Sequence, residues 1–167
     1  EGIVRGIYKL QSSEVASPKA TVNLFGSGAI LRHVLLAQEL LAEKFDVAAD
    51  VWSATSYQQL RDEALSCERW NRLHPLEEQR RSYVESVLGG RSGPFVAASD
   101  YVRTFADQIR PFVPGRYTVL GTDGFGRSDT REKLRYFFEV DRHWVTLASL
   151  AALAEDVARD YDRYEFH

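Results

Sequence analysis

The stretch Thr21-Val22-Asn23-Leu24-Phe25-Gly26-Ser27-Gly28-Ala29-Ile30-Leu31 predicts a buried strand, a tight turn and the start of a helix. The run Val22–Phe25 is almost continuously apolar, which is typical of strands covered on both faces in a mostly parallel sheet. Gly26-Ser27-Gly28 ends this strand, and apolar residues at three- and four-residue steps then predict a helix over Ala29–Phe45. A buried strand that leads directly into an amphipathic helix favours α/β layering.

The same alternation of short apolar runs and amphipathic stretches continues along the chain. Further strands are predicted at Ile3–Leu10, Asp50–Ala54, Phe95–Ala98 and Tyr117–Leu120, and further helices at Tyr57–Trp70, Arg81–Leu88, Tyr101–Ile109 and Asp141–Arg159. No linker long enough to separate two domains interrupts this pattern. We therefore predict one α/β domain over residues 1–167, with a mostly parallel sheet flanked by helices.

For two helices near the C-terminus, the sequence predicts individual caps and buried side chains. Asp129 is predicted to cap a short helix, with Glu132 reaching back to the cap amide and with Leu134, Phe137 and Phe138 facing inward. The final helix is predicted to bury one side, formed by Trp144, Leu147, Ala148, Ala151, Ala154 and Ala158.

The composition excludes several classes of protein. Hydrophobic residues make up 44% and charged residues 27% of the 167, as in globular rather than disordered chains. The net charge of −3 leaves no basic excess to neutralise phosphates, so we expect no nucleic-acid partner. No apolar run reaches the ~20 residues that span a bilayer, so we expect no membrane partner. Cys67 is the only cysteine, which favours a reducing compartment and a cytoplasmic location.

Polar or glycine-rich segments follow four of the predicted strands. These segments are Gly26-Ser27-Gly28, Thr55-Ser56, Ser99-Asp100 and Gly121–Asp123. Parallel strands joined by right-handed crossovers place their carboxyl ends on one edge of the sheet. Open α/β sheets usually bind ligands or make functional contacts at that edge. The sequence therefore predicts that any functional surface lies there.

Gly26-Ser27-Gly28 resembles part of a dinucleotide-binding fingerprint. The complete fingerprint needs a third glycine, where this chain has Leu31, and an acidic residue after the next strand, which here ends Ser53-Ala54-Thr55. We interpret the two glycines as a sharp turn from strand to helix. Their exposed amides remain candidates for contact with an anion or an acidic side chain of a partner.

The loop Gly121-Thr122-Asp123-Gly124-Phe125-Gly126-Arg127-Ser128 contains an Asp-Gly followed by a Phe-Gly. It lacks the additional motifs that would indicate phosphoryl transfer. Its glycines permit positive φ, and its phenylalanine could fill a hydrophobic hole. We predict that two loops contact a neighbouring domain, through Gly26, Ser27 and Gly28 in the first and Asp123, Gly124, Phe125, Gly126 and Arg127 in the second.

No set of residues predicts catalysis or metal binding. Cys67 and His74 are seven residues apart, but Pro75 disfavours helical geometry at His74, so a buried inert thiol and a loop histidine are the better interpretation. The four histidines are scattered, without a second ligand at zinc spacing. We assign no catalytic, cofactor-binding or metal-binding residue.

Longer segments carry a resemblance to a known family. The most specific are Cys67-Glu68-Arg69-Trp70-Asn71-Arg72-Leu73-His74-Pro75 and the run 120–132, supported by Glu1–Leu10 and the run 24–32. In this order and spacing they resemble the C-terminal domain of the homodimeric, bacterial-type pyruvate dehydrogenase decarboxylating component, a transketolase-like, thiamine diphosphate-dependent family. The resemblance implies a three-layer fold with a mixed, mostly parallel sheet of about five strands, the first antiparallel at the edge.

The resemblance also implies a longer parent polypeptide. Its upstream domains would bind thiamine diphosphate and magnesium at a dimer interface, decarboxylate pyruvate and pass the acetyl group to a lipoyl arm of the dihydrolipoyl acetyltransferase component. The family's Gly-Asp-Gly motif with its later paired asparagines is absent, since Asn23 and Asn71 are the only asparagines. No catalytic residue is therefore carried over. The chain also lacks methionine, even at position 1, and we expect it to be a fragment.

Three hypotheses follow for the function. In the first, the domain is non-catalytic and packs on the pyrimidine-binding domain of the parent, extending the homodimer contact. In the second, it is a stand-alone regulatory module that binds an anion or small ligand at the same edge. In the third, it is a separate subunit of a split thiamine enzyme.

Overall fold

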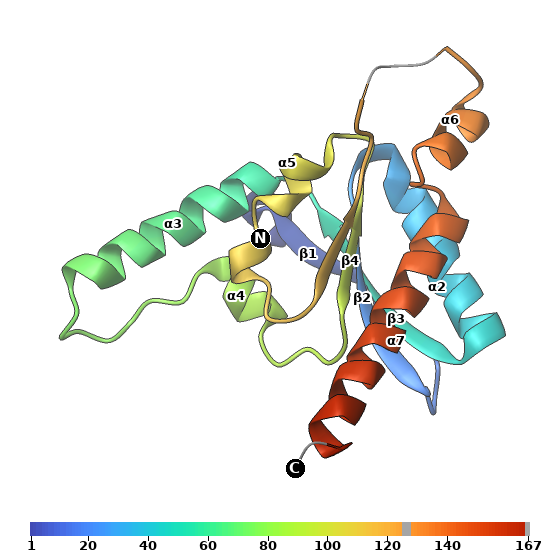
Figure 1. Cartoon of the computed structure of the whole chain (residues 1–167). Coiled ribbons are helices and arrows are strands. Elements are labelled where there is room, and N and C mark those ends of the chain that lie inside the picture. Colours follow the sequence, from blue (N-terminus) through green and yellow to red (C-terminus); the bar gives the residue numbers. More distant parts are fainter. Residues whose placement is uncertain (125–127, 166–167) are drawn as a thin grey trace.

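The computed structural model describes residues 1–124 and 128–165, and its centre is a five-stranded sheet in the order β1-β3-β2-β4-β5 (Figure 1). The strands are β1 (Ile7–Gln11), β2 (Ala20–Gly26), β3 (Val47–Ala54), β4 (Phe95–Ala98) and β5 (Tyr117–Leu120). β1 pairs antiparallel with β3, and the other three pairings are parallel. The mixed, mostly parallel sheet with an antiparallel edge strand is therefore confirmed.

Helices cover both faces of the sheet and form the outer two of three layers (Figure 1). They are α1 (Gly2–Arg5), the 3-10 helix η1 (Gly28–Ile30), α2 (Leu31–Phe45), α3 (Tyr57–Leu73), α4 (Tyr83–Leu88), α5 (Arg103–Asp107), the 3-10 helix η2 (Arg110–Phe112), α6 (Arg131–Phe137) and α7 (Arg142–Glu165). Helices α2 and α7 cover one face, and α3, α4 and α5 lie on the other.

Alternate residues of the central strands point to opposite faces, so each face has its own hydrophobic core. Phe25 and Phe95 pack on the α3–α5 side with ring centroids 5.7 Å apart, and Trp52 joins the same cluster. Their strand neighbours Leu24 and Val51 pack on the α2–α7 side. This double burial explains why most residues of β2, β3 and β4 are apolar.

The first predicted strand, Ile3–Leu10, is wrong over its first half. Gly2–Arg5 forms the helical turn α1, and β1 begins only at Ile7. Gly6 separates the two with a φ of +106°, and a Cβ atom there would lie 2.7 Å from the Ser56 carbonyl oxygen. The chain reverses at this glycine because only glycine tolerates both the backbone angle and the close approach.

The predicted apolar side of the final helix coincides only in part with the side that is buried. The buried residues of α7 are Val145, Thr146, Ser149 and Ala152, whereas Leu147 is 54% exposed and Ala151, Ala154 and Ala158 are exposed. Trp144 and Ala148 are half-buried. The Ser149 hydroxyl donates to the Val145 carbonyl oxygen at 2.7 Å, which satisfies it within the helix and lets a polar residue face the core.

The cap of α6 is Thr130 rather than the predicted Asp129. The Thr130 hydroxyl accepts from the Lys133 amide at 3.4 Å, and Asp129 instead accepts from the Thr130 amide at 2.7 Å. Thr130 has the extended conformation that a cap requires. Phe137, predicted to face inward, is 49% exposed.

The remaining predicted elements agree with the structure to within three residues at each end, except that α7 continues to Glu165. Strands β4 and β5 have the predicted bounds at both ends.

Candidate functional site at the carboxyl edge of the sheet

The parallel strands β2, β4 and β5 end side by side, at Gly26, Ala98 and Leu120. We define the carboxyl edge as the loops 26–28, 99–102 and 121–124 together with α5 and α6. The fourth predicted segment, Thr55-Ser56, is closed off by the N-terminal turn. The amides of Thr55 and Ser56 both donate to the Gly6 carbonyl oxygen, at 2.8 and 3.1 Å.

Gly26 and Gly28 allow the sharp turn between β2 and α2, as the sequence predicts. A Cβ atom on Gly26 would lie 2.8 Å from the Leu31 side chain and 2.9 Å from its Cα, so helix and strand can approach this closely only with glycine. Gly28 has a φ of +56°. The hydroxyl oxygen of Ser27 is buried and has no hydrogen-bond partner among the described residues.

The loops after β4 and β5 hold each other in place. The Thr122 amide donates to the Tyr101 carbonyl oxygen at 2.9 Å, and the Thr122 hydroxyl donates to the Asp100 carbonyl oxygen. Asp123 accepts from the Arg103 amide at 2.9 Å and from Arg103 Nε at 2.5 Å. These hydrogen bonds hold the pKa of Asp123 below its usual range. The backbone of the edge is therefore preorganised.

Asp123 was predicted to contact a neighbouring domain, but the structure turns its carboxylate toward the first turn of α5. Gly124 lines a pocket of the edge and has a φ of +100°. Phe125, Gly126 and Arg127 lie outside the described residues. The described residues of the predicted contact loops are thus brought to one edge, where Asp123 is exposed and pairs with Arg103, and their contact with a neighbouring domain stays a prediction.

Aromatic side chains on the outside of the carboxyl edge were missed by the sequence analysis. Tyr101 is 60% exposed and Phe105 is 40% exposed, with ring centroids 5.4 Å apart. Val102 between them is also largely exposed. Aromatic residues directly after the strand end Ser99-Asp100 are the signal that could have identified this surface.

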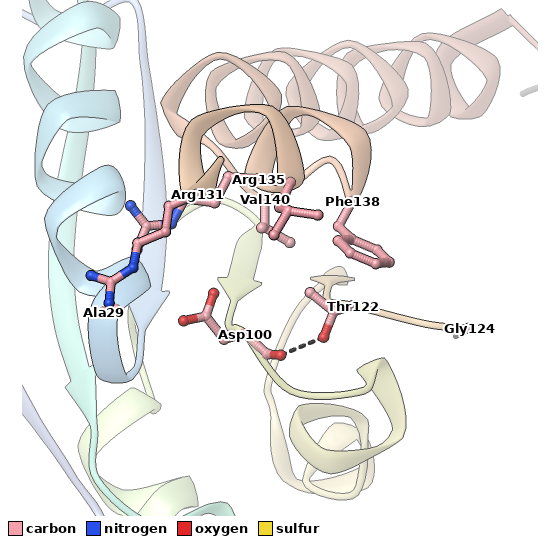
Figure 2. A pocket seen from close by; sticks show the side chains of 9 residues that line it. Ala29, Asp100, Thr122, Gly124, Arg131, Arg135, Phe138 and Val140 are labelled. Atoms are coloured by element: carbon pink, nitrogen blue, oxygen red, sulfur yellow. Dashed lines mark hydrogen bonds between the residues drawn. The ribbon is translucent and has the colours of Figure 1, made fainter. Parts of the chain in front are cut away.

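A pocket of about 540 Å³ opens between α6, the start of α2 and the two tied loops (Figure 2). Arg131 and Arg135 reach into it from α6, and Ala29, Asp100 and Phe138 are among the other residues that line it. Arg135 Nη1 lies 3.0 Å from Nε2 of His33. Burial of the His33 ring and the neighbouring Arg135 charge lower the pKa of His33, which favours the neutral ring.

Cys67 and His74 make separate contacts on α3. The Cys67 thiol lies 3.6 Å from a Glu63 carboxylate oxygen, and burial, with Glu63 nearby, raises its pKa. The His74 ring stacks on Trp70 with centroids 4.3 Å apart, and its Nδ1 lies 2.8 Å from the Trp70 carbonyl oxygen. A raised pKa makes the thiol a poor nucleophile at neutral pH.

Two further features are absent from the part of the chain that the structure describes. Within it, no three His, Cys, Asp or Glu side chains gather in a way that could hold a metal ion. Also within residues 1–124 and 128–165, no helix combines the length and apolarity needed for a membrane crossing.

Curated proteins similar to this chain share one name. The chain is 55% identical over 156 residues to the pyruvate dehydrogenase E1 component of Pseudomonas aeruginosa, which covers 93% of this chain and 18% of that protein. It is 52% identical to the same component of Cupriavidus necator, over 98% of this chain and 18% of the relative. The Escherichia coli K12 component is 51% identical, over 93% and 17%. The chain thus spans under a fifth of these relatives.

Similar solved structures show the fold, at low sequence identity. A transketolase from Campylobacter jejuni superposes with a TM-score of 0.60 and 17% identity over 90% of this chain and 19% of that one. An inactive β4 tetramer of a split-gene transketolase gives 0.59 and 17%, over 92% and 43%. A family model described as the transketolase-like TK C-terminal domain matches residues 6–141. The chain therefore belongs to the transketolase-like C-terminal domain family.

Proposed function

We propose that this chain is the non-catalytic C-terminal domain of a pyruvate dehydrogenase E1 component, within a longer polypeptide. The domain packs through its carboxyl edge on the upstream part of that polypeptide and supports assembly of a homodimer. The parent decarboxylates pyruvate with thiamine diphosphate and transfers the acetyl group to a lipoyl group of the dihydrolipoyl acetyltransferase component, in the cytoplasm.

The observation that carries this proposal is the exposed aromatic surface of the carboxyl edge. Tyr101, Val102 and Phe105 stand outward on a backbone that Thr122 and Asp123 already hold in place. Exposed apolar clusters rimmed by polar residues mark interaction surfaces. Because the loops are preorganised, a partner could bind them without an entropic cost of ordering the backbone.

Thiamine diphosphate and magnesium belong, in this proposal, to other parts of the parent. The residues described here do not fit them, since they bring together no metal-binding group of three acidic, histidine or cysteine side chains. We therefore derive no reaction step within this domain. The domain contributes to catalysis indirectly, by stabilising the packing and the dimer of the enzyme.

The test is a pair of substitutions in the full-length enzyme. Tyr101→Ser combined with Phe105→Ser should reduce dimer stability in sedimentation velocity and lower activity to the same degree. A matched control is Leu76→Ser, which changes a side chain that is 99% exposed beyond the far end of α3 and should leave both properties unchanged. Full activity and an unchanged dimer in the double variant would reject the proposal.

A further inference from the structure

The two arginines of the carboxyl-edge pocket lack acidic partners. Among the described residues no carboxylate lies within ion-pair distance of Arg131 or Arg135, although both line the same pocket. Figure 2 shows both side chains extending from α6 toward Ala29. Guanidinium groups present several fixed donors and bind carboxylates and phosphates in a bidentate manner. Two such groups, one helical turn apart, point to an anionic ligand.

The protein positions one of these arginines through a neutral histidine. With the pKa of His33 lowered, Nε2 can accept a hydrogen bond from Arg135 Nη1 at 3.0 Å. A neutral acceptor orients the guanidinium without cancelling its charge. The remaining donors of Arg135 are therefore left for the pocket.

The start of α2 adds to the positive field of the two arginines. Ala29 of η1 lines the pocket, and no side chain caps the amides at this helix start. The positive end of the α2 dipole, which follows η1, therefore lies next to the guanidinium groups. Together they offer more donors than one carboxylate can accept, which favours a phosphate group with its three oxygens.

The rest of the pocket is suited to an organic body rather than to a bare ion. Phe138 and the fully buried Val140 supply apolar walls, and the volume of about 540 Å³ is in the range of small-molecule sites. Asp100 also lines the pocket, and among the described residues its carboxylate has no cationic partner. A carboxylate beside an anion site repels phosphate but accepts hydrogen bonds from hydroxyl groups.

We propose that this pocket binds a small organic phosphate that carries free hydroxyl groups. The phosphate lies between Arg131, Arg135 and the start of α2, and a hydroxyl group donates to Asp100. This site goes beyond the proposed packing function: it lies within the same carboxyl edge, but its lining does not include Tyr101 or Phe105, on which the packing proposal rests.

The proposal is tested by calorimetric titration of the full-length protein with inorganic phosphate and glycerol 3-phosphate, with glycerol as the uncharged control. Both phosphates should bind saturably, glycerol 3-phosphate more tightly, and glycerol should not bind. Arg131→Gln and Arg135→Gln should each weaken binding about tenfold. The matched control Arg72→Gln, an exposed arginine on α3, should leave affinity unchanged.

A substitution with the opposite expected effect on affinity distinguishes loss of binding from loss of folding. Asp100→Asn removes a negative charge and should tighten inorganic phosphate binding several-fold, with a smaller gain for glycerol 3-phosphate, whose hydroxyl loses its carboxylate acceptor. Absence of saturable binding to the unsubstituted protein, or equal affinity in the arginine variants, would overturn the proposal. If the arginine variants instead lose only the dimer, the pocket holds an acidic side chain of the polypeptide, and the packing function still stands.

Discussion

The lateral edge of the sheet and its carboxyl edge differ in whether their side chains find partners within the domain. At the lateral edge, formed by β1 and β3, Lys9 Nζ donates to Asp50 at 2.6 Å. The buried Gln38 of α2 donates to the Ala49 carbonyl oxygen at 2.6 Å and accepts from Gln11 at 2.7 Å. At the carboxyl edge, by contrast, the backbone is held by hydrogen bonds, while Tyr101 is 60% exposed and Arg131 has no acidic partner among the described residues.

The difference indicates a division of roles. A polar group that is satisfied within the domain contributes to its stability, because removing one partner leaves the other buried and unpaired. A side chain that stands outward on a rigid backbone contributes little to folding and is available for a partner. We therefore expect substitutions at the lateral edge to change the unfolding free energy, and substitutions at the carboxyl edge to change assembly and binding.

The largest expected contrast is between two aromatic residues. Trp52 of β3 is 2% exposed, so Trp52→Ala should cost about 3–5 kcal/mol of unfolding free energy through the cavity that it leaves. Tyr101→Ala should cost less than about 1 kcal/mol, because its ring is mostly in solvent. Urea denaturation of both variants measures the difference. Equal losses would remove the distinction between the two edges.

A second contrast concerns two glutamines. Gln38→Ala leaves the Ala49 carbonyl and the Gln11 amide without their partner and should cost about 1–3 kcal/mol. Gln58→Ala, an exposed position on α3, should change stability by less than about 0.5 kcal/mol. Chemical denaturation midpoints with a common slope provide the comparison. A Gln38→Ala loss no larger than that of Gln58→Ala would show that the buried network adds nothing.

A smaller effect separates two candidate caps at the carboxyl edge. Thr130→Ala removes the hydroxyl that accepts from the Lys133 amide and should destabilise α6 by about 1 kcal/mol. Asp129→Ala should cost less, because its carboxylate accepts from the adjacent Thr130 amide and makes only a long, exposed ion pair with Lys133, at 4.0 Å. Amide hydrogen exchange of α6 reports the local opening. Faster exchange in Asp129→Ala than in Thr130→Ala would restore Asp129 as the cap.

The smallest expected effect is a pH dependence at the lateral edge. Burial tends to raise the pKa of Asp50, but hydrogen bonds from Lys9 and the Ser13 amide outweigh it and hold the pKa below the usual 3.8. A depressed pKa means that this stabilisation is complete above the unfolded-state value and is lost as the pH falls through the folded-state value.

This effect is measured as the difference in unfolding free energy between the unsubstituted protein and Asp50→Asn. The difference should be constant near neutral pH and shrink below pH 3.8. Glu68→Gln, an exposed position on α3, should show no such trend. A difference that does not change with pH would contradict the assigned ion pair.

The sequence predicts the central sheet well because its strands are buried on both faces. Phe95–Ala98 and Tyr117–Leu120 have the predicted bounds, since Pro94 and Ser99 flank the first strand and Arg116 and Gly121 flank the second. The start of β1 was wrong because the sequence Ile3-Val4-Arg5 is compatible with a strand. Only the packing of Gly6 against Ser56 shows that the chain must turn there.

The helices and the candidate site are less predictable. The helix α7 carries two sets of small and apolar residues, and its neighbour α2, rather than its own pattern, selects the one that contains Val145 and Ser149. Arg131 and Arg135 follow the pattern of solvated helix residues in the sequence. Only the tertiary structure places them in one pocket beside the start of α2, with no acidic partner among the described residues.

Hydrogen exchange of the carboxyl-edge amides, compared between this chain alone and the full-length protein, tests the central claim most directly. If the edge packs on the rest of the polypeptide, the amides of residues 99–105 should exchange at least tenfold more slowly in the full-length protein, while the Lys9–Asp50 region exchanges equally in both. Identical exchange of residues 99–105 in the two samples would contradict the account.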